Sequence, residues 1–168
     1  MKTVVFFLLF AAVALKATAA PAEEAPGPKI EVKDEPKPVH SQYCLPDWEF
    51  FRGSCFYMNR NYNSWSVAVS NCAAFEATLA AVHSPLEYNH FQYMVGTAGY
   101  SSAWIGGFHF ESSWRWHDGS LFDYNNFKSG GSGSTHKCLR MDTRAGQGWY
   151  SYPCSYGAPS ICQMKVHC

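Results

Sequence analysis

The sequence has no excess of charge and few of the motifs that mark whole classes of protein. Its 13 basic and 13 acidic residues cancel, which excludes recognition of nucleic acid or an anionic membrane by bulk charge. No Cys-x-x-Cys pair or clustered Cys/His pair offers the spacing of a zinc site. The chain also has no nucleophile elbow, His-Glu-x-x-His motif or phosphate loop, so the pattern favours a protein that is not an enzyme.

Long apolar runs are scarce, and the main one lies at the start of the chain. Val4 to Leu15 follow the basic Lys2 and lead into a stretch of small residues that ends at Ala20. This run is too short to span a bilayer comfortably, and the layout is typical of a cleaved secretory signal. We expect a signal peptide over residues 1–19 and a secreted, extracellular protein without membrane insertion.

Large aromatic side chains are absent from residues 20–42, and residues 20–43 are rich in Pro, Glu and Lys. Such a segment cannot bury enough apolar surface to offset the entropy that it would lose on ordering. We expect residues 20–43 to be a solvated arm or a pro-segment that is removed, and the sequence leaves both open.

Residues 44–168 have a different composition, with all seven cysteines and all six tryptophans. Their length suits one domain with a single core. Seven cysteines in a secreted domain predict three disulfides and one thiol left over, and Cys168 at the end is the natural odd one. An odd thiol in an oxidising compartment favours an interchain bridge, so we expect a disulfide-linked homodimer.

The pattern of residues 44–168 predicts an α+β domain. Aromatics that alternate with polar residues around Arg52-Gly53 predict a hairpin. A first helix is expected where apolar residues recur at helical spacing, namely at Trp65, Ala68, Val69, Cys72 and Phe75. Further strands are expected within residues 103–108, 113–122, 137–141, 148–154 and 160–164.

A second helix is expected from Pro85 to Val95, because its start carries three separate signals. Ser84 can cap the helix, Pro85 suits the first helical position, and Glu87 completes a capping box.

A set of motifs occurs in order along this domain. They are Cys44 and Cys55 flanking Trp48 and Gly53; Trp65 and Cys72; LAAVHSPLE at 79–87; WIGG at 104–107; WRWHDGS at 114–120; and Cys138, Trp149, Cys154 and Cys162. On these motifs the domain resembles the C-type lectin-like family over nearly all of residues 44–168. It is similar to small secreted lectins of fish mucus, plasma and venom, and one group of fish antifreeze proteins resembles the same fold. The resemblance implies two helices packed on short antiparallel strands, with a long loop region.

The resemblance also implies a disulfide pairing, which spacing alone leaves open among fifteen arrangements. The implied bridges are Cys44–Cys55, Cys72–Cys162 and Cys138–Cys154. The first closes a hairpin, the second ties the first helix to the last strand, and the third fixes the base of the long loop.

Sugar-binding members of this family hold calcium on the long loop, through a Glu-Pro-Asn or Gln-Pro-Asp triplet, a Glu before the loop cysteine, and an Asn-Asp pair. The resemblance puts these positions at Gly131, Gly133, His136, Tyr150 and Ser151, none of which has a carboxylate or amide side chain. Calcium needs several oxygen ligands, mostly carboxylates. We therefore expect this calcium site to be lost, with no metal or cofactor bound, and we expect the Gly/Ser-rich loop to be mobile.

Sugar recognition without calcium would need aromatic faces for the ring and polar groups for its hydroxyls. The candidates near the loop are Asn125, Asn126, His136, Lys137, Trp149, Tyr150, Ser151 and Tyr152. Simpler explanations compete with three of them. Trp149 belongs to the family core pattern, and His136 and Lys137 are typical of solvated loop residues.

These observations favour a secreted soluble lectin that binds carbohydrate independently of calcium and agglutinates microbes in mucosal or innate defence. Galactosides such as lactose are the favoured class, microbial or mucosal glycans the expected partners, and a covalent dimer would supply two sites. Two alternatives stay open: an ice-binding protein on the same fold, and a module that binds a protein and no sugar. Ice binding favours regularly placed small hydroxyls, and the sequence offers only an irregular set, at Thr97, Ser101, Ser102, Ser132, Ser134 and Thr135.

Overall fold

The computed structural model describes residues 44–132, 137–144 and 148–166. The expected signal peptide (residues 1–19), the expected arm (20–43), Gly133, His136 and Cys168 lie outside the described residues.

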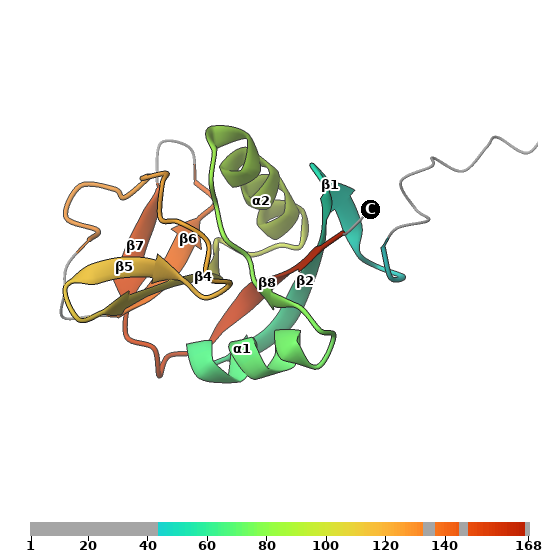
Figure 1. Ribbon diagram of the computed structural model, residues 1–168, viewed down its shortest axis with the longest axis horizontal. Coiled ribbons are helices and arrows are strands. Elements are labelled where there is room, and N and C mark those ends of the chain that lie inside the picture. Colours follow the sequence, from blue (N-terminus) through green and yellow to red (C-terminus); the bar gives the residue numbers. More distant parts are fainter. Residues whose placement is uncertain (1–43, 133–136, 145–147, 167–168) are drawn as a thin grey trace, which may run out of the picture. The chain divides into compact units, whose positions relative to one another are not determined.

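The described chain is built around one sheet and two helices, α1 (Trp65–Ala73) and α2 (Pro85–Thr97) (Figure 1). The strands are β1 (Glu49–Phe51), β2 (Ser54–Asn63), β3 (Thr78–Leu79), β4 (Ser102–Phe110), β5 (Ser113–Trp116), β6 (Cys138–Asp142), β7 (Trp149–Tyr152) and β8 (Ala158–Lys165). They form the order β1-β2-β8-β4-β6-β7, with β3 paired to β8 and β5 paired to β4. The expected α+β fold, with two helices packed on short strands, is confirmed.

The strand pairing departs from expectation at one place. β4 and β8 are parallel, with Trp104 opposite Ser160, whereas the other strand pairs are antiparallel. The resemblance implied short antiparallel strands, and this one parallel pair makes the sheet mixed. Short apolar strands carry no sequence signal for direction, which is set by the path of the chain between them.

The sheet separates two apolar clusters, because neighbouring residues of a strand point to opposite faces. On one face Phe56 and Ile161 pack with the buried side of α2. On the other, Tyr57 and Cys162 pack with Cys72 of α1. Figure 1 shows the helices on opposite sides of β2 and β8. The same alternation applies to β7, where Trp149 belongs to the cluster that packs against α2.

The helix signals were correct at their starts and less accurate beyond. The Ser84 hydroxyl accepts a hydrogen bond from the Glu87 N–H, and the Glu87 carboxylate accepts one from the His83 N–H at 2.6 Å. α2 runs two residues past its expected end at Val95, to Thr97. Phe75 was expected on the apolar face of the first helix, but α1 ends at Ala73 and Phe75 is 42% exposed.

The three disulfides are Cys44–Cys55, Cys72–Cys162 and Cys138–Cys154, as the resemblance implied. The last of them ties the start of β6 to the residue that lies shortly after β7. It therefore holds together the two strands that lie beside the long loop.

The first part of the Gly/Ser-rich loop is packed against β7. Phe127 forms a parallel bridge with Trp149, and the Ser151 N–H donates to the Gly131 carbonyl at 2.6 Å. Gly131 itself is buried. The expectation of a mobile loop therefore does not describe residues 127–131, which extend the sheet beyond its edge strand.

Among the residues that the structure describes, no helix is both long and apolar enough to cross a membrane.

Candidate functional site

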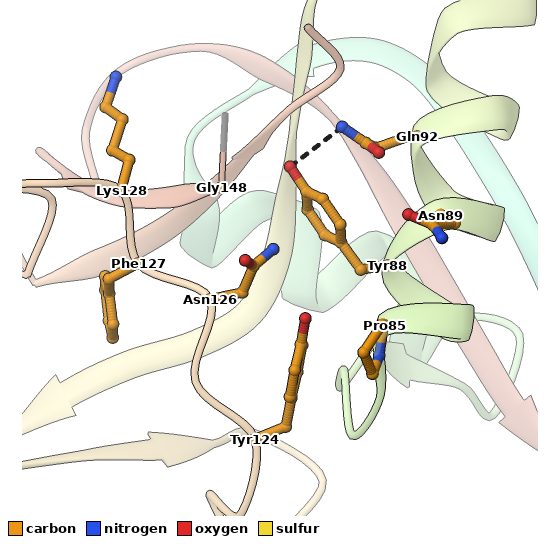
Figure 2. Close-up of a pocket in the computed structure, with 9 residues that line it drawn as sticks. All are labelled: Pro85, Tyr88, Asn89, Gln92, Tyr124, Asn126, Phe127, Lys128 and Gly148. Carbon is orange, nitrogen blue, oxygen red and sulfur yellow. Dashed lines mark hydrogen bonds between the residues drawn. The ribbon is translucent and has the colours of Figure 1, made fainter. Parts of the chain in front are cut away.

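An open pocket of about 340 Å³ lies between α2 and the segment that leads into the Gly/Ser-rich loop (Figure 2). Its lining residues are Pro85, Tyr88, Asn89, Gln92, Tyr124, Asn126, Phe127, Lys128 and Gly148. In Figure 2 the side chains of Tyr124 and Asn126 extend toward the ring of Tyr88, whose hydroxyl points to Gln92, whereas Lys128 extends away from them. The pocket thus gathers phenol and amide groups from two parts of the chain.

The wall on the α2 side is held by hydrogen bonds to the end of β6 and to Arg144 just after it. The Tyr88 hydroxyl donates to the Asp142 carbonyl at 2.8 Å. Gln92 Nε2 donates to the Tyr88 oxygen at 3.2 Å and also to the Asp142 and Arg144 carbonyls. These bonds fix the orientation of both side chains before any ligand arrives.

The two phenols of the pocket stay protonated at neutral pH. Burial, followed by the nearby Asp142 carboxylate, raises the pKa of Tyr88 well above its ordinary value. Burial likewise raises the pKa of Tyr124. A neutral phenol can both donate and accept a hydrogen bond. The Tyr88 hydroxyl already does both within the protein, so the phenol that the pocket offers to a sugar hydroxyl is that of Tyr124.

The amides of Asn89 and Asn126 complete the polar lining. Asn89 is exposed on α2, and Asn126 is half-buried. Within the part of the chain that the structure describes, neither side chain makes a hydrogen bond, so both have donors and acceptors to offer.

The residues predicted from the sequence are only partly brought together. Asn126 lines the pocket, but the neighbouring Asn125 side chain accepts a hydrogen bond from the Phe127 N–H at 3.1 Å. Lys137 is exposed just before β6, and His136 lies outside the described residues. Of the loop-side polar candidates, Asn126 is therefore the one at the pocket.

The predicted residues of β7 divide between its two faces. Trp149 has no exposed surface and is surrounded by Trp116, Phe122 and Phe127, with ring centroids 5.3–5.9 Å away. Its ring serves the core and presents no face to a ligand. Ser151 shares that side of the strand, whereas Tyr150 and Tyr152 alternate to the other side.

Two cations lie on the outward tyrosines of β7. Lys128 Nζ is 4.2 Å from the ring centroid of Tyr150, and the Arg140 guanidinium carbon is 4.7 Å from that of Tyr152. The two tyrosine rings are themselves 5.8 Å apart, edge to face. We call Lys128, Tyr150, Tyr152 and Arg140 the cationic tyrosine row.

A Ser–His–Asp arrangement lies at the start of α2, but its hydrogen bonds differ from those of a hydrolase. His83 Nδ1 is 2.7 Å from Asp123 Oδ1, and His83 Nε2 is 3.1 Å from Ser120 Oγ. The single hydroxyl proton of Ser120 goes to Asp118 Oδ1, at 2.5 Å. It is not given to the histidine, as activation of a nucleophile requires. The group is therefore a brace between α2 and the chain after β5.

Comparison with known proteins agrees with the fold. The model of the Lectin C-type domain family matches residues 61–164.

The chain belongs to the C-type lectin domain family.

Three similar proteins illustrate what this chain resembles. Ladderlectin from Oncorhynchus mykiss is 37% identical over 131 residues, which are 73% of this chain and 69% of that protein. The type-2 ice-structuring protein of Osmerus mordax is 32% identical over 123 residues, 71% of this chain and 70% of that protein. The solved structure of a calcium-independent type II antifreeze protein is 26% identical, with a TM-score of 0.67, over 74% of this chain and 95% of that one. These relatives are lectins and antifreeze proteins, not enzymes.

At two of the family's calcium positions that the structure describes, Tyr150 and Gly131, the surroundings disfavour a dication. The Lys128 ammonium lies over Tyr150, where it would repel a dication. The backbone carbonyl of Gly131 is already hydrogen-bonded, and an added Cβ there would lie 2.8 Å from the Trp149 carbonyl oxygen. Within residues 44–132, 137–144 and 148–166, no three His, Cys, Asp or Glu side chains gather as metal ligands.

Sequence reasoning missed the pocket residues Tyr88, Asn89, Gln92, Tyr124 and Lys128. For the three on α2 there was no usable signal, because the pattern of a helix does not say which loop its polar face will meet. Lys128 could have been found from charge. Residues 124–152 hold four basic residues (Lys128, Lys137, Arg140, Arg144) and one acidic residue (Asp142) in a chain of balanced charge.

Proposed function

We propose that this chain is a secreted lectin that binds carbohydrate without calcium, in the pocket between α2 and residues 124–128. The observation that supports it is the lining of this pocket by the neutral phenol of Tyr124 and the amides of Asn89 and Asn126, beside the fixed side chains of Tyr88 and Gln92. Sugar hydroxyls pair with such groups, and no metal is needed to present them. The membership of the family and the similarity to ladderlectin favour a sugar as the ligand.

The sugar class and the biological setting are part of the same proposal. Galactosides such as lactose are the class that we favour, by analogy with similar secreted lectins. The apolar start of the chain and its similarity to ladderlectin favour export through a signal peptide at residues 1–19. Agglutination of microbes on mucosal surfaces is the role that we propose.

Binding of lactose, measured by calorimetry in calcium and again in EDTA, tests the proposal. We expect the same affinity in both conditions. Asn126→Ala removes an amide from the pocket and should weaken binding about tenfold, the loss of roughly one good polar contact. Asn61→Ala, an exposed amide on β2, serves as the matched control.

Two results would contradict the proposal. Binding that disappears in EDTA would show that calcium is required. No binding to any member of a broad glycan array in either condition would show that the chain is not a lectin.

Agglutination needs two sites, for which we propose a dimer linked through Cys168. Non-reducing electrophoresis should show a dimer that becomes a monomer on reduction, and Cys168→Ser should abolish it. A monomer under both conditions would exclude the covalent dimer.

Ice binding is the second candidate, favoured by the similarity to the type-2 ice-structuring protein. The described hydroxyls do not form a free, regular array. Ser102 is buried and accepts a hydrogen bond from Arg140, and Thr97 Oγ1 donates back to the Tyr93 and Met94 carbonyls. Thermal hysteresis at millimolar protein together with absence of glycan binding would reverse the order of the two candidates. The third candidate is a module that binds a protein partner and no sugar. Absence of binding on the glycan array would be compatible with this candidate.

A further inference from the structure

We propose that the preferred ligand is an acidic saccharide, a sugar that carries a sulfate or a carboxylate, recognised by the cationic tyrosine row beside the pocket. This inference rests on the proposed function and names the class of sugar that it would take.

Charge is the first observation. Residues 124–152 contain Lys128, Lys137, Arg140 and Arg144 against the single carboxylate of Asp142, although the whole chain is neutral. Asp142 is buried, and Arg144 pairs with it, with Arg144 Nη2 at 2.5 Å from Asp142 Oδ2. The carboxylate of this segment is thus already neutralised.

The second observation is that the two cations of the row, Lys128 and Arg140, form no ion pair with a carboxylate among the described residues. Arg140 Nη2 donates to the Ser102 hydroxyl, while its Nε is buried without a hydrogen-bond partner in the described part of the chain. The guanidinium lies against the rings of Trp104 and Tyr152 and its Nε is buried, so an anion would meet Arg140 through its terminal nitrogens.

The arrangement of the row is the third observation. Tyr150 and Tyr152 have their rings on the face of β7 opposite Trp149, with Lys128 against the first ring and Arg140 against the second. Both tyrosines are half-buried, and Tyr152 also packs against the cluster that contains Trp104. Tyr156 packs edge-on against Tyr152 and is more than half exposed, which extends the aromatic surface. A pyranose ring can lie on a tyrosine while its charged substituent meets the adjacent cation.

The row also lies next to the pocket. Lys128 lines the pocket and contacts Tyr150, so one saccharide could place neutral hydroxyls among the amides and its charge on the row. Tyr150 occupies a position where calcium-binding members of the family carry a metal ligand. The Lys128 ammonium over the Tyr150 ring favours a net negative ligand over a neutral one.

The test compares lactose with 3′-sulfolactose and 3′-sialyllactose, by calorimetry at 50 mM and 300 mM NaCl with EDTA present. We expect at least one acidic form to bind about tenfold or more tightly than lactose, and the advantage to shrink at the higher salt concentration. The pair of acidic probes distinguishes sulfate from carboxylate as the preferred group.

Variants assign the preference to the row. Lys128→Gln should bring the ratio of acidic to neutral affinity close to one, and Lys128→Arg should restore it. Arg60→Gln removes an equally charged, exposed side chain on β2 and should keep the ratio. Arg140→Gln should lower the ratio too, and it is interpreted only when its melting temperature matches the parent.

The outcomes separate this inference from the proposed function. Equal affinities for lactose and for the acidic forms would overturn the inference, but they would still be consistent with the proposed lectin function. No binding of any of the three, nor of other glycans, would remove both. Competition by inorganic sulfate or polyphosphate as strong as that by the acidic sugars would also overturn the inference, because charge alone, as in binding of any polyanion, would then explain it.

Discussion

Gly148 and Gly131 lie where the loop and the sheet approach most closely. A Cβ on Gly148 would stand 1.9 Å from the Asn126 carbonyl oxygen, which accepts the Trp149 N–H. A Cβ on Gly131 would stand 2.8 Å from the Trp149 carbonyl oxygen. Neither contact can be relieved by a side-chain movement, because all these neighbours are backbone. These two glycines hold the floor of the site in place, and they are not parts of a passive spacer.

Gly148→Ala should therefore destabilise the protein by about 2–3 kcal/mol, since the backbone on one side of the contact must move. Gly96→Ala is the matched control. It lies in α2, a Cβ there meets nothing within 4 Å, and alanine should stabilise the helix by up to about 1 kcal/mol. Equilibrium unfolding in guanidinium measures both. A neutral Gly148→Ala would mean that the loop is not held against β7.

The side chains of β7 show which part of the site the sequence could predict. Alternation along a strand places Tyr150 and Tyr152 opposite Trp149 and Ser151, and the structure has them so. The family pattern correctly marked Trp149 as a core residue. What alternation could not predict is that Lys128, twenty-two residues earlier, would lie over Tyr150.

At the scale of elements, the sequence predicted local features such as caps and turns, but it did not predict which elements contact one another. The cap at Ser84 and the turn at Arg52-Gly53, where both residues have positive φ, follow from short-range chemistry. The pocket depends instead on which face of α2 meets residues 124–128. That approach is fixed by tertiary packing around Phe91 and Trp149, and no local pattern encodes it.

The disulfides join elements over very different distances along the chain, and their contributions should differ accordingly. Cys72–Cys162 spans 90 residues and joins α1 to β8, whereas Cys44–Cys55 spans 11 and closes the first hairpin. The loop-closure entropy of the unfolded chain gives about 4.5 kcal/mol for the first and about 3 kcal/mol for the second. Both half-cystines of Cys72–Cys162 are fully buried, which adds to the difference.

We expect Cys44→Ala/Cys55→Ala to fold with a lowered melting temperature, and Cys72→Ala/Cys162→Ala to lose most of its structure at 37 °C. Circular dichroism against temperature compares the two double variants with the parent. Equal losses would show that loop length does not govern the contributions of these bridges.

For the whole molecule, pH acts through several groups in the same direction. The Arg144 guanidinium beside Asp142, and the His83 ring beside Asp123, hold the pKa of each carboxyl below its ordinary value. Burial alone would raise the pKa of Asp118, but hydrogen bonds from Ser120 and Lys165 hold it below its usual range as well. Burial lowers the pKa of His90, with Glu49 opposing it. In each case the unfolded chain binds protons more readily than the folded one.

Stability should therefore fall as the solution is acidified, in two stages. The His90 contribution begins to be lost as pH drops through its unfolded value of about 6.5, and those of the carboxylates as pH drops below about 4. At higher pH all four contributions are fully present. The free energy of unfolding, measured in guanidinium from pH 7 to pH 3, should decrease steadily with the steepest part below pH 4.

Asp142 and Arg144 allow the acid stage to be assigned to one pair. Asp142→Asn should lower the free energy of unfolding at pH 7, because Arg144 loses a charged partner, and should flatten the fall below pH 4. Arg144→Gln keeps the carboxylate but removes the cause of its lowered pKa, so it should flatten the same part of the curve. Arg144 is largely exposed, so its replacement disturbs no packing. Curves for both variants that run parallel to that of the parent would show that the acid sensitivity arises elsewhere, and would leave Asp118 and Asp123 as its sources.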